Sequence, residues 1–309
     1  MSGFAWLRAR VACPALQLQA LSRGQFRDKL VWRAPGGDRV VDIVASHGSR
    51  VAATFVAAQP AASTRAKASA TALVLVHGSH GPLSLYRYLA ERFAQRGIGT
   101  LLPDLPAFGR TPAPQPPYSA EPFTGVPAVK AAVEWLGAQS GIDRAHIHVL
   151  GHSFGASVAL AAARQHASLV RSVIAFGPSR RVEERAIGVS AKEAAMWQAR
   201  FALSRRLKGT PSPELMEAVS RATGLEYHMD YWKAEHPPAL LVDCEMESEA
   251  DRAFLKDLAG RMSPPISYRT LPAADHYLNS GSFGRWVVVD RRAVDAFVAW
   301  TMEWLALND

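Results

Sequence analysis

Residues 145–166 read AHIHVL, GHSFG and ASVALAAARQH in succession, so that one apolar run leads into Gly151–Gly155 and a second apolar run leaves it. The first run favours a buried strand, and the second has the length and composition of a helix. The five residues between them match G-x-S-x-G, which is typical of a sharp strand-to-helix turn. A serine at such a corner has strained backbone angles, and glycines two residues to either side remove collisions with the neighbouring backbone. The turn is therefore expected to hold the hydroxyl of Ser153 in the open, at the start of a helix whose first N–H groups are unpaired.

The stretches around this turn alternate between strands and helices. Apolar runs predict buried strands at 71–76, 99–105, 145–150, 170–176, 239–242 and 266–271, and helical spacing predicts helices at 84–96, 129–136, 154–166, about 250–261 and about 291–307. This alternation favours an α/β fold with a mostly parallel central sheet and helices on both faces. Such a sheet places its chemistry outside the carboxyl ends of its strands. Residues near 28–59 alternate polar and apolar instead, which indicates short antiparallel strands.

The composition is that of an ordinary globular protein. The 309 residues are 49% hydrophobic and 20% charged, which is enough to bury a large core. We expect a single domain over residues 1–309, with an insertion and with a peripheral N-terminal segment of about 1–27. The two cysteines, Cys13 and Cys244, favour neither a disulfide framework nor a cysteine metal site, so a reducing, cytoplasmic compartment is expected.

The net charge of +8 would suit an anionic partner, but the positive residues occur as short pairs such as Arg180 and Arg181, without a long basic run. A solvated surface is therefore favoured, and no nucleic-acid partner is expected. No run of about 18 apolar residues occurs, so no membrane span is expected either. Arg8 and Arg10 interrupt what would have to be the apolar core of a signal peptide.

The strand, the G-x-S-x-G turn and the following helix resemble the α/β-hydrolase superfamily, of the serine esterase and lipase-like kind, and the resemblance covers roughly residues 70–309. It implies the α/β-hydrolase fold with an inserted helical lid, here about 180–236. It also implies that Ser153 is the nucleophile of a catalytic triad in which the serine, an acid and a histidine follow one another along the chain.

In that family the base is a histidine on a loop beyond the last sheet strand. Of the ten histidines, only His276 follows the strand predicted at 266–271, so the resemblance assigns it the role of base. Its neighbour Asp275 is expected to shape the loop, because the side chains of immediate sequence neighbours seldom meet.

The family places its acid in a turn just past the strand that follows the lid. The matching stretch is residues 241–247 (LVDCEME), in which Glu247 takes the place of the acid, although aspartate is more common there. A glutamate can still hold the imidazole tautomer and stabilise the imidazolium. Asp251, Glu245 and Asp243 remain alternatives.

The oxyanion hole of the family uses one backbone N–H from the loop after a strand ending in His-Gly, and another from the residue after the nucleophile. Here those donors are the N–H groups of Ser79 and Phe154. His77 is expected to hold the loop, while His80 is a candidate for substrate contact.

Several aromatic residues lie in the predicted lid, which spans about 180–236. In the resembling family a lid roofs the substrate pocket, which implies an apolar acyl or aromatic pocket. The alternative is that the stripe of Met196, Leu203 and Leu207, with Trp197 and Phe201 beside it, is only the packed face of a helix. The candidate pocket residues are His80, Trp197, Phe201, Tyr227 and Trp232, with Tyr231 beside them.

The expected function is cleavage of a carboxylic ester of a small molecule through an acyl-enzyme intermediate. The same triad also serves amidases or peptidases, acyltransferases and hydrolases of carbon–carbon bonds, and a catalytically silent binding protein of the same fold is the alternative of another class. No cofactor is implied, because no glycine-rich phosphate loop occurs. His146 and His148 fall on one face of a predicted strand, but no cysteine or carboxylate cluster joins them, so no metal is expected.

Overall fold

The computed structural model describes residues 29–36, 39–45, 48–59, 71–81, 83–178, 212–225, 232–262 and 266–309. The predicted N-terminal segment and most of the predicted lid lie outside the described residues.

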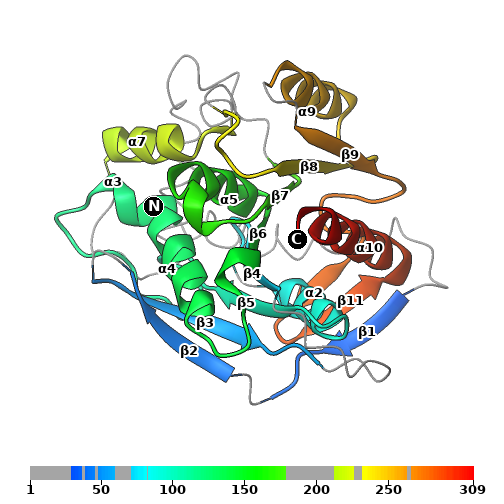
Figure 1. The fold of residues 1–309 in the computed structure, drawn as a ribbon, viewed down its shortest axis with the longest axis horizontal. Coiled ribbons are helices and arrows are strands. Elements are labelled where there is room, and N and C mark those ends of the chain that lie inside the picture. Colours follow the sequence, from blue (N-terminus) through cyan, green and yellow to red (C-terminus); the bar gives the residue numbers. More distant parts are fainter. Residues whose placement is uncertain are drawn as a thin grey trace, which may run out of the picture.

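A sheet of eight strands forms the centre of the molecule (Figure 1). Two strands at one edge pair antiparallel with their neighbours, and all the following pairs are parallel. The predicted mostly parallel sheet, preceded by antiparallel strands, is therefore confirmed. In spatial order the strands are β2 (Arg39–Val44), β3 (Arg50–Val56), β5 (Gly99–Pro103), β4 (Ala72–Val76), β6 (Ile147–His152), β7 (Val173–Phe176), β8 (Ala239–Cys244) and β9 (Ser267–Leu271).

The central strands are apolar throughout because both faces of the sheet are covered. In β4 all five residues are buried, with Val74 and Val76 in one core and Leu73 and Leu75 in the other. Successive side chains of a strand point to opposite faces, so the continuous apolar run fills two separate layers.

Helices cover both faces of the sheet, as Figure 1 shows. The helices α4 (Val126–Gly137), α5 (Phe154–Gln165) and α9 (Glu249–Arg261) contribute to the core with Val74. The helices α2 (Ser84–Ala94) and α10 (Arg291–Asn308) contribute to the core with Leu73. Two further helices, α3 (Ala120–Thr124) and α7 (Pro213–Thr223), pack on each other beside the first layer.

A second, three-stranded antiparallel sheet adds to the layer of α2 and α10. It consists of β1 (Lys29–Arg33), β11 (Trp286–Asp290) and β10 (Gly281–Phe283). The sequence predicted neither β10 nor β11. It also did not indicate that β1 pairs with a strand from the far end of the chain.

Most predicted elements are present with small shifts at their ends. The strand predicted at 145–150 is β6 and starts at Ile147, because residues 144–146 form a short 3₁₀ turn (η2, Arg144–His146). His146 consequently precedes the strand, and the prediction that it shares a strand face with His148 is wrong. The His146 side chain is 33% exposed and its Nδ1 lies 3.0 Å from Oδ2 of Asp143. The His148 side chain, in contrast, is fully buried.

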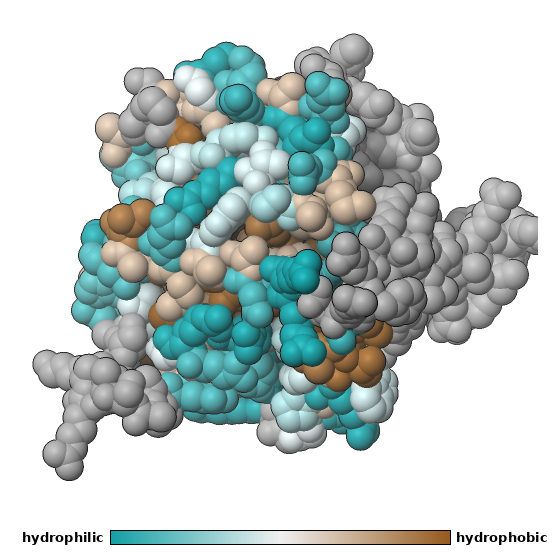
Figure 2. All heavy atoms as spheres, turned by 90° about the vertical axis from the view of Figure 1, so that its right-hand side faces the viewer, coloured by the Kyte–Doolittle hydropathy of each residue, from teal (hydrophilic) through white to brown (hydrophobic). Residues whose placement is uncertain are grey.

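The surface of the face shown in Figure 2 is a mosaic of hydrophilic and hydrophobic residues in its described part. Scattered exposed hydrophobic residues are normal for a folded protein. The large hydrophobic residues exposed in the described part are Val31, Val40, Val44, Met246, Trp286 and Leu307. Across the described residues, no helix has both the length and the apolar character needed to span a bilayer.

Four loops that carry predicted site residues leave the sheet at the carboxyl ends of parallel strands. His77 follows β4, Ser153 follows β6, Glu247 follows β8 and His276 follows β9. Because the carboxyl ends of parallel strands share one edge of the sheet, these loops converge there.

Candidate active site

The turn between β6 and α5 is strained at Ser153. Its backbone has φ 56° and ψ −121°, a conformation that side-chain-bearing residues rarely adopt. The flanking glycines are required by space, because a Cβ on Gly151 would lie 2.0 Å from the Gly155 carbonyl oxygen and one on Gly155 would lie 2.4 Å from the Val76 oxygen. The backbone at Ser153 is held by its N–H, which donates to the Phe176 carbonyl at 2.9 Å. The sharp turn predicted from the sequence is thus present.

The strained turn leaves the Ser153 side chain partly exposed while its neighbours in the strand are buried. In the described part of the chain, no group forms a hydrogen bond with its hydroxyl. Strain of this kind persists where surrounding contacts impose it, and it gathers at functional sites. Ser153 is therefore placed to meet a ligand.

His276 and Glu247 are hydrogen-bonded side chain to side chain. Nδ1 of His276 lies 2.8 Å from Oε1 of Glu247, and the two side chains are 29% and 27% exposed. A carboxylate can only accept, so Nδ1 carries the hydrogen and the imidazole leaves Nε2 as the proton acceptor. This is the tautomer that a general base facing a hydroxyl requires.

The other three carboxylates considered from the sequence have different partners. Asp243 is buried and accepts from the Tyr268 hydroxyl at 2.6 Å, and burial raises the pKa of its carboxyl. Glu245 accepts from the Ala273 N–H at 2.7 Å, and Asp251 accepts from the Ser248 hydroxyl at the start of α9. Of the four candidates, Glu247 is the one that contacts His276 in the described part of the chain.

The loop that carries His276 is shaped by Asp275, as expected from its position. Asp275 Oδ1 accepts from the N–H groups of Tyr277 at 2.9 Å and Asn279 at 2.7 Å. The Asn279 side chain returns a hydrogen bond to the Ala273 carbonyl at 2.7 Å. These bonds stabilise positive φ angles at Ala273 and Asn279, so the loop has a defined shape although it lacks regular structure.

Ser153 and His276 both lie against the end of β7. Phe176 accepts the Ser153 N–H, and the next residue, Gly177, is so close to the imidazole that a Cβ there would lie 3.0 Å from Nδ1 and Cε1 of His276. Gly177 also has φ +56°, which favours glycine. The structure therefore brings the serine turn and the histidine loop to the same end of one strand.

The loop after β4 approaches Ser153 from the other side. A Cβ on Gly78 would lie 3.1 Å from the Cβ of Ser153, so glycine permits this approach. His77 fixes the loop: its Nδ1 lies 2.7 Å from the Gly78 oxygen, and its Nε2 accepts from the Leu105 N–H at 2.9 Å. Burial lowers the pKa of His77, which agrees with a neutral ring making these two bonds.

The backbone N–H groups of Ser79 and Phe154 are the predicted donors of an oxyanion hole. Ser79 follows Gly78, and its N–H forms no hydrogen bond with any described residue. Phe154 is the first residue of α5 and directly follows Ser153.

Two site residues were missed by the sequence analysis. Tyr86 accepts from the Gly78 N–H at 2.9 Å, and its oxygen lies 2.8 Å from Nδ1 of His152. His152 Nε2 in turn lies 2.8 Å from the His276 carbonyl oxygen. Tyr86 falls on the buried face of α2, so its apolar neighbours gave no sign of a polar role.

The predicted pocket residues separate into three groups. His80 is exposed, with its ring 6.0 Å from that of Tyr277. Trp232 is 5% exposed and belongs to the core that includes residues of α5. Trp197, Phe201 and Tyr227 lie outside the described residues.

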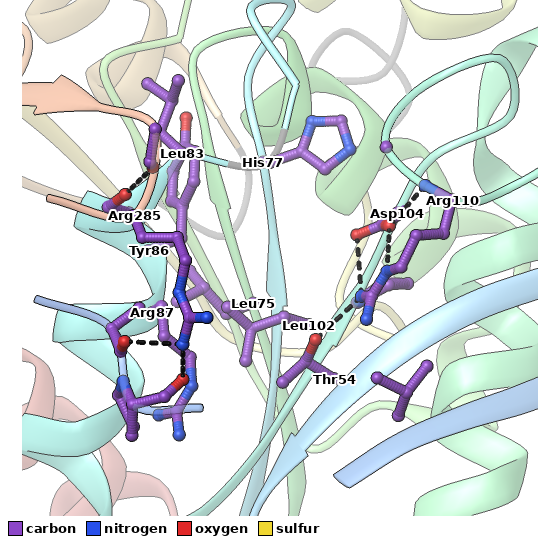
Figure 3. Close-up of a pocket in the computed structure, with 17 residues that line it drawn as sticks. Thr54, Leu75, His77, Leu83, Tyr86, Arg87, Leu102, Asp104, Arg110 and Arg285 are labelled. Atoms are coloured by element: carbon purple, nitrogen blue, oxygen red, sulfur yellow. Dashed lines mark hydrogen bonds and ion pairs between the residues drawn. The ribbon is translucent and has the colours of Figure 1, made fainter. Parts of the chain in front are cut away.

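A cavity of about 490 Å³ lies between residues of β3 and α2, the segment that follows β1, and the loops after β4 and β5 (Figure 3). His77 and Tyr86 line it, whereas Ser153 and His276 do not. Figure 3 shows Arg110 reaching Asp104 and Thr54 across its edge, with hydrogen bonds of 2.9 Å from Nε and 2.8 Å from Nη2. The candidate site at Ser153 is therefore distinct from this cavity.

A second array of a serine, a histidine and a carboxylate, in this case Ser–His–Asp, occurs near the amino ends of the strands, away from the Ser153 site. Ser172 Oγ lies 2.7 Å from Nδ1 of His148, and Asp309 Oδ1 lies 3.0 Å from its Nε2. Ser172 is completely buried and its oxygen accepts from the Trp304 indole at 3.0 Å, so it cannot meet a substrate. This array is structural, and exposure distinguishes Ser153 from it.

The described residues contain no group of three or more His, Cys, Asp or Glu side chains arranged to hold a metal. Cys244 is buried, and burial raises the pKa of its thiol, which disfavours the thiolate needed for metal binding or nucleophilic attack.

The comparisons with known proteins agree with the fold. No curated protein matches the sequence. The solved structures that match include monoglyceride lipase from Saccharomyces cerevisiae, with 14% identity, a TM-score of 0.60, and coverage of 89% of this chain and 97% of that one. They also include Est1E from Butyrivibrio proteoclasticus, with 14% identity, a TM-score of 0.56 and coverage of 86% and 99%, and DcsB in complex with its substrate analogue, with 14% identity, a TM-score of 0.60 and coverage of 88% and 100%. A family profile described as the alpha/beta hydrolase family matches residues 73–296. From the profile match and from the sheet, its loops and the strained serine turn, we conclude that this chain belongs to the alpha/beta hydrolase family.

Proposed function

We propose that the protein is a serine hydrolase that cleaves a carboxylic ester of a small molecule, with Ser153 as nucleophile, His276 as base and Glu247 as the acid that orients the base. The observation that carries the proposal is the 2.8 Å hydrogen bond between Glu247 and Nδ1 of His276, which leaves Nε2 unprotonated at the end of the strand where Ser153 is exposed. Family membership supports a hydrolase.

The reaction follows from these groups. Nε2 of His276 takes the proton of Ser153 as Oγ attacks the ester carbonyl carbon, and the carbonyl oxygen becomes an oxyanion. The N–H groups of Ser79 and Phe154 stabilise this oxyanion. The imidazolium then gives its proton to the leaving alkoxide, the carbon–oxygen bond to the alcohol breaks, and the acyl group stays on Ser153.

Water completes the cycle. His276 takes a proton from a water molecule, whose oxygen attacks the acyl carbonyl. The second tetrahedral species collapses as His276 returns the proton to Ser153 Oγ, and the carboxylic acid leaves. Glu247 stays ionised throughout and stabilises the imidazolium.

An ester substrate is favoured over an amide by the solved structures that the fold resembles. One of them is named as a monoglyceride lipase, and Est1E is also recorded with ferulic acid bound. Amide hydrolysis and acyl transfer use the same triad, and we keep them as alternatives. We also propose that the insertion near 180–236 forms a lid, because Met216 and Val219 of α7 pack in one cluster with Phe154, next to the nucleophile.

The test uses p-nitrophenyl esters of graded acyl length with the wild type, Ser153→Ala and Ser157→Ala. Ser157 lies one turn along α5, is buried and serves as the matched control. We expect turnover by the wild type and by Ser157→Ala, none above background by Ser153→Ala, and a fluorophosphonate adduct on Ser153. Equal turnover in all three proteins would show that Ser153 is not the nucleophile, and absence of both turnover and labelling in the folded wild type would favour the silent binding protein.

The alternatives are separated by matched substrates. A p-nitroanilide with the best acyl group measures amidase activity, and adding a short-chain alcohol to the ester assay measures partition of the acyl-enzyme to a second acceptor. We expect the ester to react at least ~100-fold faster than the anilide, and water to be the main acceptor. A larger rate with the anilide, or product found mainly as the new ester, would replace esterase by amidase or acyltransferase.

A further inference from the structure

The three loops around the proposed site are joined by a chain of hydrogen bonds behind it. Gly78 N–H donates to the Tyr86 oxygen at 2.9 Å, this oxygen lies 2.8 Å from Nδ1 of His152, and Nε2 of His152 lies 2.8 Å from the His276 carbonyl oxygen. Gly78 belongs to the proposed oxyanion loop, His152 precedes the nucleophile, and His276 is the proposed base. This series of hydrogen bonds thus ends on the backbone N–H of Gly78 and on the backbone carbonyl of His276, and His152 directly precedes Ser153.

The groups at the two ends of this hydrogen-bond series, the Gly78 N–H and the His276 carbonyl, determine which atom carries each hydrogen. An amide N–H can only donate, so Tyr86 accepts at one end and has its own hydrogen free for Nδ1 of His152. A carbonyl can only accept, so Nε2 of His152 carries a hydrogen and donates it to His276. The assignment requires a neutral tyrosine and a neutral histidine, with no donor or acceptor left over.

Burial holds both residues in these forms. Tyr86 and His152 are each 2% exposed. Burial lowers the pKa of His152 well below its usual value and raises the pKa of the Tyr86 hydroxyl, so both stay neutral across the pH range of ordinary assays. The His152 ring is also stacked on Phe176 with centroids 4.9 Å apart, which restricts its rotation.

We infer that Tyr86 and His152 are positioning residues that hold the backbone of His276 and the loop at Gly78 in register with Ser153. The inference rests on the proposed function and names a second support for its base. Glu247 controls the rotation of the His276 ring through Nδ1, whereas His152 fixes the main chain from which that ring projects. Because His152 directly precedes Ser153, its hydrogen bond to the His276 carbonyl couples the position of the nucleophile to that of the base. A displacement of about 1 Å at such a site costs roughly 100-fold in rate.

The experiment compares Tyr86→Phe, His152→Gln and His152→Asn with Tyr88→Phe as the matched control. Tyr88 is a buried tyrosine of the same helix that packs against Trp32, away from the site. The amide nitrogen of glutamine occupies the place of Nε2 and keeps the donor to His276, while the asparagine oxygen occupies the place of Nδ1 and keeps only the acceptor for Tyr86. The readouts are kcat and KM for the best p-nitrophenyl ester, and the rate and final stoichiometry of fluorophosphonate labelling.

We expect Tyr86→Phe to lower kcat by about 10- to 100-fold with KM changed less than about threefold, and to slow labelling while it still reaches one adduct per chain. His152→Gln is expected to retain more kcat than His152→Asn, and Tyr88→Phe to match the wild type. A purely structural role predicts a different result, in which labelling stops below one adduct per chain and the loss of activity equals the loss of labelled protein.

Two outcomes overturn the inference. The first is wild-type kcat in folded Tyr86→Phe and in both His152 variants. The second is a loss of activity accounted for by a smaller active fraction. If Tyr86→Phe does not fold, the order of the glutamine and asparagine variants decides, and equal kcat for the two rejects the inference. Failure of the proposed function is recognised separately, because the folded wild type would then show neither turnover nor labelling, or Ser153→Ala would remain active.

Discussion

Nδ1 of His276 and Oε1 of Glu247 lie 2.8 Å apart, although the two residues are on separate loops that follow β8 and β9. The strands that carry these loops are parallel neighbours, with Cys244 opposite Leu271 at their carboxyl ends. Because the register of the pair fixes how far each loop starts beyond the sheet, the contact follows from sheet geometry and not from chance proximity.

This contact predicts the effect of Glu247→Gln. Glutamine keeps the shape but its amide donates as well as accepts, so the imidazole loses the preference for hydrogen on Nδ1 and the imidazolium loses its counter-charge. We expect kcat for an ester to fall by roughly 10³-fold, with little change in KM. Glu245→Gln is the control, because Glu245 accepts from the Ala273 N–H and glutamine can still accept there. Comparable losses in the two variants would remove Glu247 from the triad.

The glycines give a prediction about stability. A Cβ on Gly151 would meet backbone at 2.0 Å, which no side-chain movement relieves, whereas a Cβ on Gly260 within α9 meets nothing within 4 Å. We expect Gly151→Ala either to fail to fold or to lose about 4–5 kcal/mol of its free energy of unfolding, which is the size of the largest effects of single mutations. Gly260→Ala should gain about 0.5–1 kcal/mol, because alanine restricts the unfolded chain and suits a helix interior. Urea unfolding of both variants measures these changes. Wild-type stability of Gly151→Ala would contradict the close approach of Gly151 to the Gly155 carbonyl.

Much of the fold could be predicted because its signals are local. Burial of a strand is visible in its own sequence, as in the apolar runs of β4, β6, β7 and β8, and a close backbone approach is visible in the glycines at 151 and 155. The family resemblance placed Glu247 and His276 on two loops that meet. Chain order and loop position were sufficient for those residues.

The features that were missed depend on contacts between distant parts of the chain. In the small sheet, Lys29 is paired with Asp290, and three-residue β10 is too short to show a periodic pattern. Tyr86 and His152 are separated by 66 positions, and each fits a buried face on its own element. Their polar roles arise because the Tyr86 side chain of α2 reaches the His152 ring at the end of β6, which no local sequence pattern indicates.

The Ser–His–Asp array at His148 predicts a loss of stability without a loss of activity. Asp309→Ala removes the acceptor of His148 Nε2 and of the Thr71 hydroxyl, which lies 3.0 Å from its other oxygen. A buried donor left without a partner costs about 1–3 kcal/mol. Since His148 lies at the start of β6 and Ser153 follows its end, kcat should stay within about twofold of the wild type. Chemical denaturation and an ester assay on the same sample test both parts, and a stable variant with impaired kcat contradicts this assignment.

Buried neutral histidines predict how stability depends on pH. Burial lowers the pKa of His77, His148 and His152 in the folded protein, whereas the same rings titrate near 6.5 when the chain is unfolded. Below that pH the unfolded state binds more protons than the folded state, so these residues contribute full stability above about pH 6.5 and lose it progressively as the pH falls towards their folded pKa values.

The measurement is the urea midpoint between pH 8 and pH 5 for the wild type and His148→Gln. Each histidine that stays neutral in the fold contributes a slope of up to about 1.4 kcal/mol per pH unit. The slope below pH 6.5 should therefore become shallower in His148→Gln. An unchanged slope in His148→Gln would mean that His148 becomes protonated without loss of the fold, with its ion pair to Asp309 offsetting the cost of burying the charge.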